Sequence, residues 1–306
     1  MFSNNVTLVY PTLPARYDLG FARIVGHGLG NCLYTYFHAV ILAKEIHAQL
    51  LAPTWPSLRI GPLLRWERSF RRYSKMFRAH PDEISGLAKT KHLLLGWPRR
   101  HRVPVGPGYR GTLRPNQMNV VITKDWTFSG LHEHRETIRR RLLEMLATPP
   151  ATPPNWGARN YVAVHIRLGD FAVARPEDLT SGRVHNLRIP LEWYEQVIRR
   201  VRAVFPELPV RIFSDGKDNE LRDVLRIQGT TLWREPDDVG DLLAMAQAKL
   251  LIGSNSTFVR WSAFLGNMPS VWFRTERLPE KYSDDAVPTL HVLQDVETIT
   301  REALSL

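Results

Sequence analysis

The segment HIRLGD, residues 165–170, places a histidine, an arginine and an aspartate around one glycine. It follows the apolar, β-rich run of residues 161–164, so we expect it at the end of a strand. Alternation along a strand points His165 and Arg167 to the same side. The planar guanidinium of Arg167 suits phosphate, because it donates two charge-assisted hydrogen bonds in a fixed geometry. The alternative is a salt bridge between Arg167 and Asp170 that closes a turn.

A second polar cluster follows the apolar strand predicted at residues 249–252. After Gly253 the chain has four consecutive residues with hydroxyl or amide side chains: Ser254, Asn255, Ser256 and Thr257. They begin a predicted helix, where backbone and side-chain donors can converge on a phosphate. Ordinary N-capping by Asn255 or Ser256 is the alternative. Because capping needs one residue of this kind, four in a row favour a ligand site.

A glycine-rich loop, GHGLGN at residues 26–31, lies between a strand predicted at 22–25 and an apolar helix predicted at 32–49. Glycine at positions 28 and 30 permits positive φ and a close approach of the backbone to a ligand. The spacing does not match Gly-x-Gly-x-x-Gly, and no P-loop lysine follows. On these residues alone, a plain turn explains the loop equally well.

The elements that must position these residues alternate between strand and helix in the second half of the chain. Strands are predicted at residues 162–167, 210–213, 231–233, 249–252 and 270–273. Helices are predicted at residues 191–205, 219–227, 239–248 and 257–265, the third capped by Asp238. This order predicts a parallel, doubly wound sheet that binds ligands outside the carboxyl ends of its strands. In the first half, a strand at 120–123 and a helix at 132–146 are also clear.

Residues 148–155 form a predicted linker, because four prolines there exclude both a helix and a central strand. We therefore expect two Rossmann-like α/β domains, residues 1–147 and residues 156–306, that face each other across a cleft. Many transferases that use nucleotide sugars have this architecture. The N-terminal domain would be the acceptor side, and the C-terminal domain would bind the nucleotide sugar.

The composition is that of a globular protein with excess positive charge. The chain of 306 residues has 41 Lys and Arg against 30 Asp and Glu, a formal net charge of +11, which predicts an anionic partner. Much of the excess lies within residues 59–141, including 65–72 and 98–102. It is either a solvated basic face or a patch that docks on an anionic membrane or substrate. Nucleic acid is not expected, since no zinc finger, RNP motif or heptad-coupled basic region is present.

The cellular compartment and metal content are expected from a few residues. Cys32 is the single cysteine, which excludes an intrachain disulfide and favours a reducing compartment. No apolar run approaches the roughly 18 residues of a membrane span, and no signal-peptide pattern is present. We therefore expect a cytoplasmic protein, with peripheral contact at the inner membrane face as a hypothesis. The histidines of HEH, residues 132–134, lack the i, i+4 spacing of a shared metal site, so no metal is expected.

Three segments occur in the order and approximate placement seen in bacterial α-1,2-fucosyltransferases, which use GDP-fucose. They are GLGN at 28–31, HIRLGD at 165–170 and SNSTFVRW at 254–261. FSD at 213–215 and LEWY at 191–194 also resemble that family. The resemblance covers residues 22–49 and most of 160–273, but little of 55–118, where acceptor recognition would vary.

The resemblance implies a GT-B fold, an inverting mechanism, GDP-β-L-fucose as the donor and no required metal or other cofactor. The reaction would be the transfer of L-fucose to a hydroxyl of a glycan acceptor, as in galactoside α-1,2-fucosylation for cell-surface polysaccharide. By the same resemblance, Arg167 would hold the β-phosphate of the donor and His165 would lie beside the nucleoside. Asp241 would read guanine, and Ser256 and Thr257 would add phosphate contacts.

The loop with Gly28, Gly30 and Asn31 would close the cleft from the other domain. Two further sets of residues are expected at the active site, the rest of the donor-binding residues and the candidate catalytic bases. The donor-binding set is completed by Asp215, Ser254 and Asn255. Three residues are candidates for the catalytic base and are not ranked: Asp170, His27 and Asp215.

Some positions depart from the family pattern and indicate a divergent member. Cys32 stands where glutamine is common, Leu168 replaces a frequent second arginine, and VRW at 259–261 replaces Ser-Trp-Trp. Two alternatives therefore stay open. One is a transferase of the same fold with another sugar or a peptide acceptor, and the other is a non-catalytic module that binds glycans or polyanions.

Overall fold

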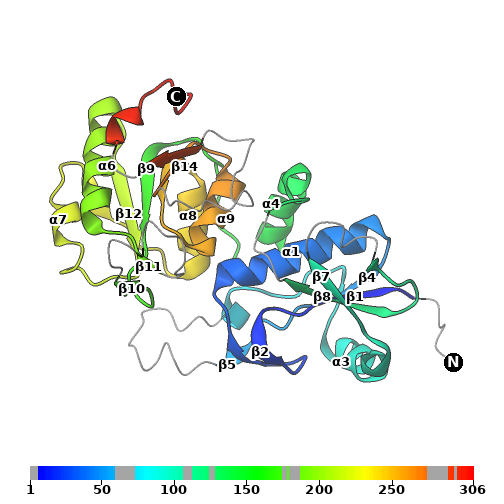
Figure 1. Ribbon diagram of the computed structural model, residues 1–306. Helices are drawn as coiled ribbons and strands as arrows, with labels where there is room; N and C mark the ends of the chain where they lie inside the picture. The colour runs from blue at the N-terminus through cyan, green and yellow to red at the C-terminus, as the bar shows by residue number, and fades with distance from the viewer. Residues whose placement is uncertain are drawn as a thin grey trace. The chain divides into compact units, whose positions relative to one another are not determined.

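The computed structural model describes residues 6–58, 73–105, 112–123, 128–173, 178, 187–273, 289–292 and 295–306. The chain divides into two compact units, Met1–Ala151 and Thr152–Leu306 (Figure 1). The division falls within the proline-rich segment. Each unit is built on its own parallel sheet with helices packed against it, so the predicted α/β class is confirmed. The basic run at 65–72 lies outside the described residues.

The second unit has a six-stranded sheet in the order β13-β12-β9-β14-β15-β16, and every neighbouring pair is parallel. Counted along the chain, this is the order 3-2-1-4-5-6 of dinucleotide-binding folds. The strands are β9 (Arg159–Ile166), β12 (Val210–Ser214), β13 (Thr230–Leu232), β14 (Ala248–Gly253), β15 (Ser270–Phe273) and β16 (Thr289–Val292). The chain reverses its direction of winding between β9 and β14, which makes the gap beyond their carboxyl ends the expected ligand position.

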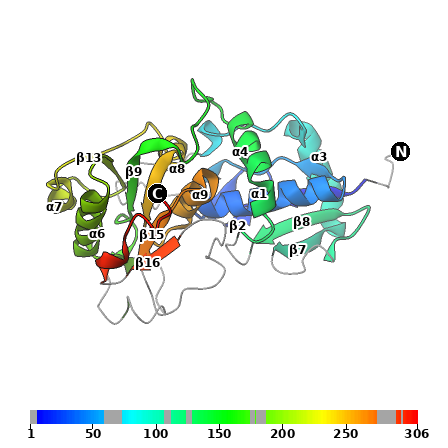
Figure 2. The same ribbon diagram turned by 90° about the horizontal axis from the view of Figure 1, so that it is seen from above.

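Helices cover both faces of this sheet (Figure 2). One face packs on α6 (Leu191–Val204), whose buried side chains include Trp193, Val197 and Val201. The opposite face packs on α8 (Asp238–Ala246) and α9 (Thr257–Gly266). This unit also contains a short pair of strands, β10 (Ala172–Val173) and β11 (Leu187–Arg188), and the 3-10 helix η6 (Val296–Thr298).

Three local predictions for this unit are wrong. The helix expected at 219–227 is the short α7 (Arg222–Leu225), because turns occupy the rest of that stretch. The N-cap of α8 is Asp237 and not Asp238, since the Asp237 carboxylate accepts a hydrogen bond from the Gly240 N–H at 2.8 Å. Arg167 lies beyond the strand to which it was assigned, because β9 ends at Ile166.

The first unit has a five-stranded sheet in the order β6-β4-β1-β8-β7, again with parallel neighbours. Its strands are β1 (Leu8–Pro11), β4 (Gln49–Leu51), β6 (Glu83–Ile84), β7 (His101–Val105) and β8 (Met118–Thr123). The helices α1 (Leu29–Glu45) and α3 (Gly86–Gly96) cover opposite faces of this sheet (Figure 1). On the α3 side, Leu8 and Tyr10 of the central strand form a core with Met118 and Val120.

The strand predicted at 22–25 does not belong to the main sheet. It is β3 (Arg23–Gly26), which pairs antiparallel with β2 (Ala15–Asp18) and parallel with β5 (Ser57–Leu58) in a separate three-stranded sheet. The main sheet instead contains β1, whose four residues are too few for a strand to be predicted from their pattern. The helix predicted to reach Gln49 ends at Glu45, because Gln49 begins β4.

The remaining helices of the first unit are short. The helix predicted at 132–146 is the 3-10 helix η4 (His132–His134) followed by α4 (Arg135–Glu144), and α4 lies beside α1 (Figure 2). Two further 3-10 helices are η1 (Tyr73–Lys75) and η2 (Trp97–Arg99). Among the helices of the described ranges, none combines the length and apolar character required to cross a membrane.

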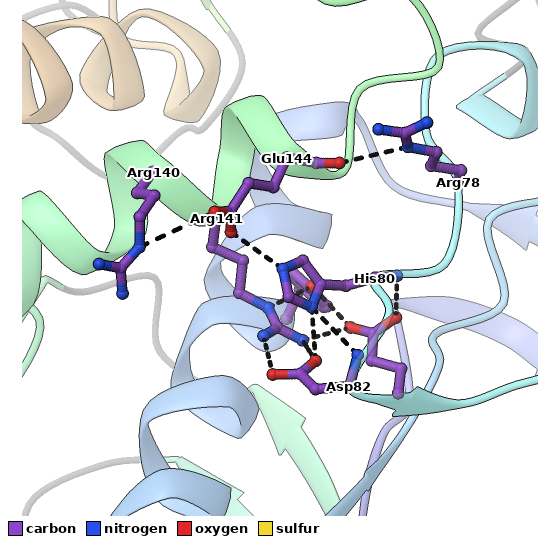
Figure 3. A network of polar contacts seen from close by, with 8 residues as sticks. Arg78, His80, Asp82, Arg140, Arg141 and Glu144 are labelled. Atoms are coloured by element: carbon purple, nitrogen blue, oxygen red, sulfur yellow. Dashed lines mark hydrogen bonds and ion pairs between the residues drawn. The ribbon is translucent and has the colours of Figure 1, made fainter.

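A buried ionic network ties α4 to the rest of this unit (Figure 3). The guanidinium of Arg141 donates to both oxygens of Asp82 and to Oε1 of Glu83, each at 2.8 Å. Its Nε donates to the Tyr36 hydroxyl, which donates in turn to Glu83 at 2.6 Å. His80 bridges Asp82 and Glu144 through its two ring nitrogens. Burial and the Glu83 carboxylate raise the pKa of Tyr36, so this hydroxyl stays protonated.

Candidate functional site

Three loops of the second unit meet at one edge of its sheet. They follow β9, β12 and β14, which are adjacent and parallel, so their carboxyl ends lie together. The three loops begin with Arg167, Asp215 and Ser254, respectively. This edge is the switch point of the strand order, where α/β sheets bind ligands. Strand pairing thus brings together residues that the sequence places nearly 90 positions apart, since His165 and Ser254 are separated by 89.

Arg167 lies between two carboxylates. Its Nη1 is 2.6 Å from Oδ2 of Asp215, and its Nη2 donates to Oδ1 of Asp170. The Arg167–Asp170 salt bridge that the sequence left open as an alternative is therefore present. Nε of Arg167 is buried and has no hydrogen-bond partner among the described residues. The side chain is 21% exposed, so the guanidinium is partly accessible to a ligand.

Asp215 fixes the loop that carries Arg167. Its Oδ1 accepts a hydrogen bond from the Leu168 N–H at 2.8 Å, while Oδ2 pairs with the arginine. Glycine at position 169 leaves room for the Asp215 carboxylate, which a Cβ there would displace. The neighbouring Ser214 hydroxyl donates to the carbonyl of Ile166 at 2.7 Å, which joins the ends of β12 and β9. The loop is thus held from the adjacent strand by both a carboxylate and a hydroxyl.

His165 joins β9 to β14 across the switch point. Its Nδ1 is 2.7 Å from the Ser254 hydroxyl, and both side chains are buried. Burial lowers the pKa of His165 to about 4, with the nearby Asp215 charge raising it and Arg167 lowering it. The imidazole is therefore neutral at physiological pH and adds no positive charge for a phosphate. The His165 ring packs on Phe258 at the start of α9, with 5.7 Å between centroids.

The hydroxyl and amide side chains of residues 254–257 have different roles at the start of α9. Ser256 is the N-cap, and its Oγ accepts from the Phe258 N–H at 3.3 Å, which is the capping alternative considered from the sequence. Asn255 is exposed, Thr257 is half-buried, and Ser254 is used in the pair with His165. The first turn of α9 carries no acidic residue, so its amide groups and dipole favour an anion.

Asp241 lies in the first turn of α8. Its Oδ1 accepts from the Glu235 N–H at 2.8 Å and so anchors the loop before the helix. Glu235 also accepts a hydrogen bond from Nε1 of Trp233 at 2.8 Å. Asp241 therefore orders a loop that follows β13 and precedes α8, and its predicted guanine contact stays a prediction.

The first-unit candidates form a separate group. Gly28 is the N-cap of α1 with φ −60°, and Gly30 and Asn31 lie in the first turn of that helix. Neither glycine uses the positive φ that its residue type permits, since Gly28 has φ −60° and Gly30 is absent from the residues with positive φ. Nδ2 of Asn31 is 3.1 Å from Nδ1 of the exposed His27. This arrangement is a helix N-terminus flanked by an imidazole, not a strained glycine loop.

Tyr194 is a buried polar residue of the core whose electrostatic environment sequence reasoning missed. It lies on α6, is buried, and its hydroxyl has no hydrogen-bond partner among the described residues. Burial raises the pKa of Tyr194, and the Asp215 carboxylate raises it further. A neutral hydroxyl thus lies within electrostatic reach of the carboxylate that holds Arg167. The helix pattern identifies this position as buried but gives no sign of its polar neighbour.

Within the part of the chain that the structure describes, no group of three or more His, Cys, Asp or Glu side chains is placed to hold a metal ion. The HEH segment forms η4, where His134 lies 3.6 Å from a carboxylate oxygen of Glu45. His134 thus contacts α1, whereas Nδ1 of His132 lies 3.5 Å from Nη2 of Arg135.

Comparison with known proteins relates the chain to enzymes that transfer sugars. No family model matches the sequence. Over 146 residues the chain is 34% identical to an α-1,2-colitosyltransferase of Escherichia coli, and the match covers 40% of this chain and 47% of that protein. The chain therefore spans about half the length of this curated relative. The relationship predicted from the motifs is confirmed to this extent: the chain is a distant relative of that colitosyltransferase.

Among solved structures, the chain is similar to an Arabidopsis thaliana FUT1 mutant in complex with GDP, with a TM-score of 0.46 and 12% identity over 92% of this chain and 72% of that one. It is similar to NodZ α-1,6-fucosyltransferase soaked with GDP-fucose, with a TM-score of 0.44 and 12% identity over 88% and 95% of the chains. The Escherichia coli heptosyltransferase WaaC with ADP matches with a TM-score of 0.46 and 12% identity over 98% and 97% of the chains.

Proposed function

We propose that the protein is an inverting glycosyltransferase of the GT-B type that moves L-fucose from GDP-β-L-fucose to a hydroxyl of a glycan acceptor. One observation carries this proposal: Arg167 lies at the switch point of a 3-2-1-4-5-6 sheet, next to the strand that leads into the N-terminus of α9. An arginine and the N-terminal amides of a helix at such an edge are suited to a diphosphate. The distant colitosyltransferase relative supports transfer of a deoxy sugar in an α-1,2 linkage.

In this proposal, the second unit binds the donor. Arg167 stabilises the charge that develops on the β-phosphate as GDP departs, and the first turn of α9 contributes backbone donors. Ser256, Thr257 and Asn255 line the same helix start, while the pair of His165 and Ser254 keeps the two strands in register beneath it. Because His165 is neutral, its role is to shape the site rather than to neutralise phosphate.

Activation of the acceptor hydroxyl is assigned to one of three groups. Asp170 and Asp215 are carboxylates that each pair with the Arg167 guanidinium through one oxygen. His27 is exposed and stands at the N-terminus of α1, in contact with Asn31. The first unit would supply the acceptor side and the loop from Gly28 to Asn31, as the proposed two-domain organisation requires. An acceptor that attacks an oxocarbenium-like centre needs little help from a base.

A second donor is favoured by the named relative, which transfers colitose. Colitose is L-fucose without its 3-hydroxyl, so a pocket for one sugar accepts the other unless it hydrogen-bonds that hydroxyl. A site built around the 3-hydroxyl would reject the deoxy analogue by roughly 10⁴-fold or more, whereas an apolar pocket would discriminate weakly. The two donors can therefore be distinguished by their relative kcat/KM.

The direct test is isothermal titration of the protein with GDP, GDP-fucose, GDP-mannose and UDP sugars, with and without EDTA, followed by an acceptor-glycan array. We expect binding of guanine nucleotides that EDTA does not weaken, and a lower but measurable affinity in Arg167→Ala. Arg226→Ala is the matched control, because Arg226 is the C-cap of α7 and its exposed side chain pairs with Asp223. A preference for a uridine nucleotide would contradict the assignment of Asp241 as the residue that recognises guanine.

The same experiment separates the enzyme from a non-catalytic module. A module would bind polyanions with a steep salt dependence and release no GDP with any acceptor. Release of GDP that depends on a particular glycan, and that is lost in Arg167→Ala, supports the transferase. Asp241→Asn should abolish the preference for guanine while leaving diphosphate binding in place.

A further inference from the structure

The outer face of α3 is apolar and exposed. Leu87, Leu94 and Leu95 are 89%, 73% and 62% exposed. With Lys91 they follow the spacing i, i+4, i+7 and i+8, which places all four on one side of a helix. The other side of the helix is packed, because Leu93 contacts the core that contains Tyr10. The leucines thus point away from the unit to which the helix belongs.

The turn between β2 and β3 lies beside α3 and carries two further exposed apolar side chains. Leu19 and Phe21 at the turn are 51% and 71% exposed, and the turn is closed by a hydrogen bond from the Leu19 N–H to the Ala22 carbonyl at 2.9 Å. Gly20 lies against α3, because a Cβ there would come within 2.6 Å of Leu93 Cδ1. The exposed side chains of the turn and of the helix therefore belong to one neighbourhood.

We call this neighbourhood the α3 surface, and we define it by the residues Leu19, Phe21, Leu87, Lys91, Leu94 and Leu95. The segment of the sequence that contains α3 carries positive charge, while Asp18, which precedes the turn, accepts hydrogen bonds from the Gly20 N–H and the Tyr10 hydroxyl. Residues 84–124 contain eight Lys and Arg and no Asp or Glu. With 30 acidic residues in 306, a stretch of that length would contain about four. Arg102 is exposed, and the guanidinium of Arg100 lies 3.8 Å from the centroid of the exposed Trp97 ring.

We propose that the α3 surface docks on an anionic lipid membrane, with α3 lying in the plane of the interface. Leucines and a phenylalanine on one side, lysine among them and an amphipathic tryptophan at the end are features of interfacial helices. The basic segment adds attraction to anionic headgroups. The proposal is independent of the proposed sugar transfer, since none of these residues belongs to the candidate site.

A protein partner fits the α3 surface less well. Lys91 lies in the middle of the leucines, and the centres of protein interfaces are depleted of lysine because burial removes its hydration. At a membrane surface the ammonium reaches lipid phosphates while its carbon chain stays among the acyl groups. The same reasoning disfavours a second copy of this chain, whose equivalent surface carries the same positive charge.

The first test is flotation of the full chain with vesicles. We expect binding to phosphatidylcholine vesicles that contain roughly a third phosphatidylglycerol, and none to phosphatidylcholine alone. Binding should weaken between about 0.05 M and about 0.5 M salt. Phe21→Ser combined with Leu94→Ser should lower the vesicle affinity at least about tenfold. Val173→Ser is the matched control, because Val173 is 80% exposed and lies in the other unit.

A second test locates the contact. Cys32 is the single cysteine and is fully buried, so Leu95→Cys offers one reactive thiol for a polarity-sensitive dye. We expect a blue shift of Leu95→Cys on anionic vesicles and none for the equally labelled Val173→Cys. Lys91→Gln should lower vesicle affinity about fivefold, whereas Arg226→Gln should leave it unchanged.

Three outcomes would overturn the proposal. The first is the absence of binding to anionic vesicles at low salt, and the second is binding that is unaffected by the Phe21 and Leu94 substitutions. The third is a dimer that these substitutions dissociate without affecting vesicle binding, which would make the α3 surface an interface between copies. GDP titration of the same variants should be unchanged, so failure here is distinguishable from failure of the proposed function.

Discussion

Asp215 holds Arg167 and the backbone beside it with one carboxylate: Oδ2 lies 2.6 Å from the guanidinium, and Oδ1 accepts from the Leu168 N–H at 2.8 Å. The conformation of the arginine loop therefore depends on a residue that follows a different strand. Asp215→Ala should lower the free energy of unfolding by about 1–3 kcal/mol, because it leaves a partly buried N–H and a guanidinium nitrogen without their acceptor. Urea denaturation would measure the change.

Asp215→Asn is the informative comparison for that substitution. Its amide oxygen can still accept from Leu168, so we expect it to recover part of the lost stability. Asp223→Ala serves as the surface control, since the exposed Asp223–Arg226 pair should contribute under about 1 kcal/mol. Equal losses for Asp215→Ala and Asp223→Ala would show that the Asp215 contacts do not stabilise the loop.

Arg167→Ala should lower kcat roughly a hundredfold or more if the guanidinium stabilises the departing GDP. Arg167→Lys should recover little of this, because an ammonium lacks the planar fork that binds two phosphate oxygens. Turnover would be measured by release of GDP, with circular dichroism to show that each variant folds. A folded Arg167→Ala protein with wild-type turnover would remove Arg167 from the mechanism.

Asp170→Asn distinguishes two roles for Asp170, that of the catalytic base and that of a residue that orients Arg167. The ion pair with Arg167 leads us to expect a change in GDP affinity that disappears in the Arg167→Ala background. In a double-mutant cycle the coupling energy should reach about 0.5–3 kcal/mol. A loss of kcat with an unchanged donor affinity would instead assign Asp170 as the base.

The buried, neutral His165 predicts a stability that falls in mild acid. The pKa is near 6.5 in an unfolded chain and about 4 in the folded protein. Between these values the unfolded chain binds a proton that the folded chain does not, so stability falls as the pH drops from about 6.5 to about 4. Over this pH range, protonation of His165 in the unfolded chain should lower the free energy of unfolding of the wild type by about 3 kcal/mol. Below pH 4 it should cause no further loss.

His165→Asn removes the titrating group and keeps a polar side chain facing Ser254. Urea midpoints at several pH values would be compared for the two proteins, since the difference cancels the contribution of other acids and bases. A wild type and a variant with parallel pH profiles would contradict the assigned neutral imidazole.

The network of Figure 3 predicts a large effect in the first unit. Arg141 and Glu83 are 9% and 1% exposed at their side chains. Arg141→Met should destabilise this unit by about 3–5 kcal/mol, because it leaves the Glu83 carboxylate buried without its cation. Arg140→Met is the matched control on the same helix, since Arg140 is 69% exposed and lies 4.0 Å from Glu144. Thermal unfolding of both variants would test the difference.

The fold of the second unit could be predicted because its strands are apolar and each is followed by a polar loop or a helix. β9 and β14 are buried along most of their length, so their patterns are strong. β16 could not be found in this way. Its sequence, Thr-Leu-His-Val, is half polar, and it is a strand because it pairs with β15.

The first unit was harder to predict because its strands are short and a charge is buried in one of them. β4 has three residues and β6 has two, too few for a periodic pattern. Arg23 in β3 is fully buried and donates to the Thr54 carbonyl at 2.6 Å, against the pattern that places arginine outside. The partner of Arg141 lies 58 residues away, and no spacing in the sequence reveals such a pair.

The sequence predicts which residue types form the candidate site, but it does not predict which of these side chains bond to each other. The end of β9 and the start of α9 are both visible in the sequence as polar clusters after apolar runs. That Ser254 bonds His165 and that Asp215 bonds Arg167 follows from the adjacency of β9 to both β14 and β12. The order of strands is a property of the assembled sheet.

Every strand pairing among the described residues lies within one of the two units. The chain can therefore be divided at 151/152 without breaking a sheet, and the halves can be recombined with those of related proteins. Under the proposed function, a chimera that carries residues 152–306 would inherit the nucleotide preference of this chain, while the other half would set which glycan receives the sugar. In evolutionary terms, donor and acceptor choice could change by exchange of gene segments instead of by stepwise substitution.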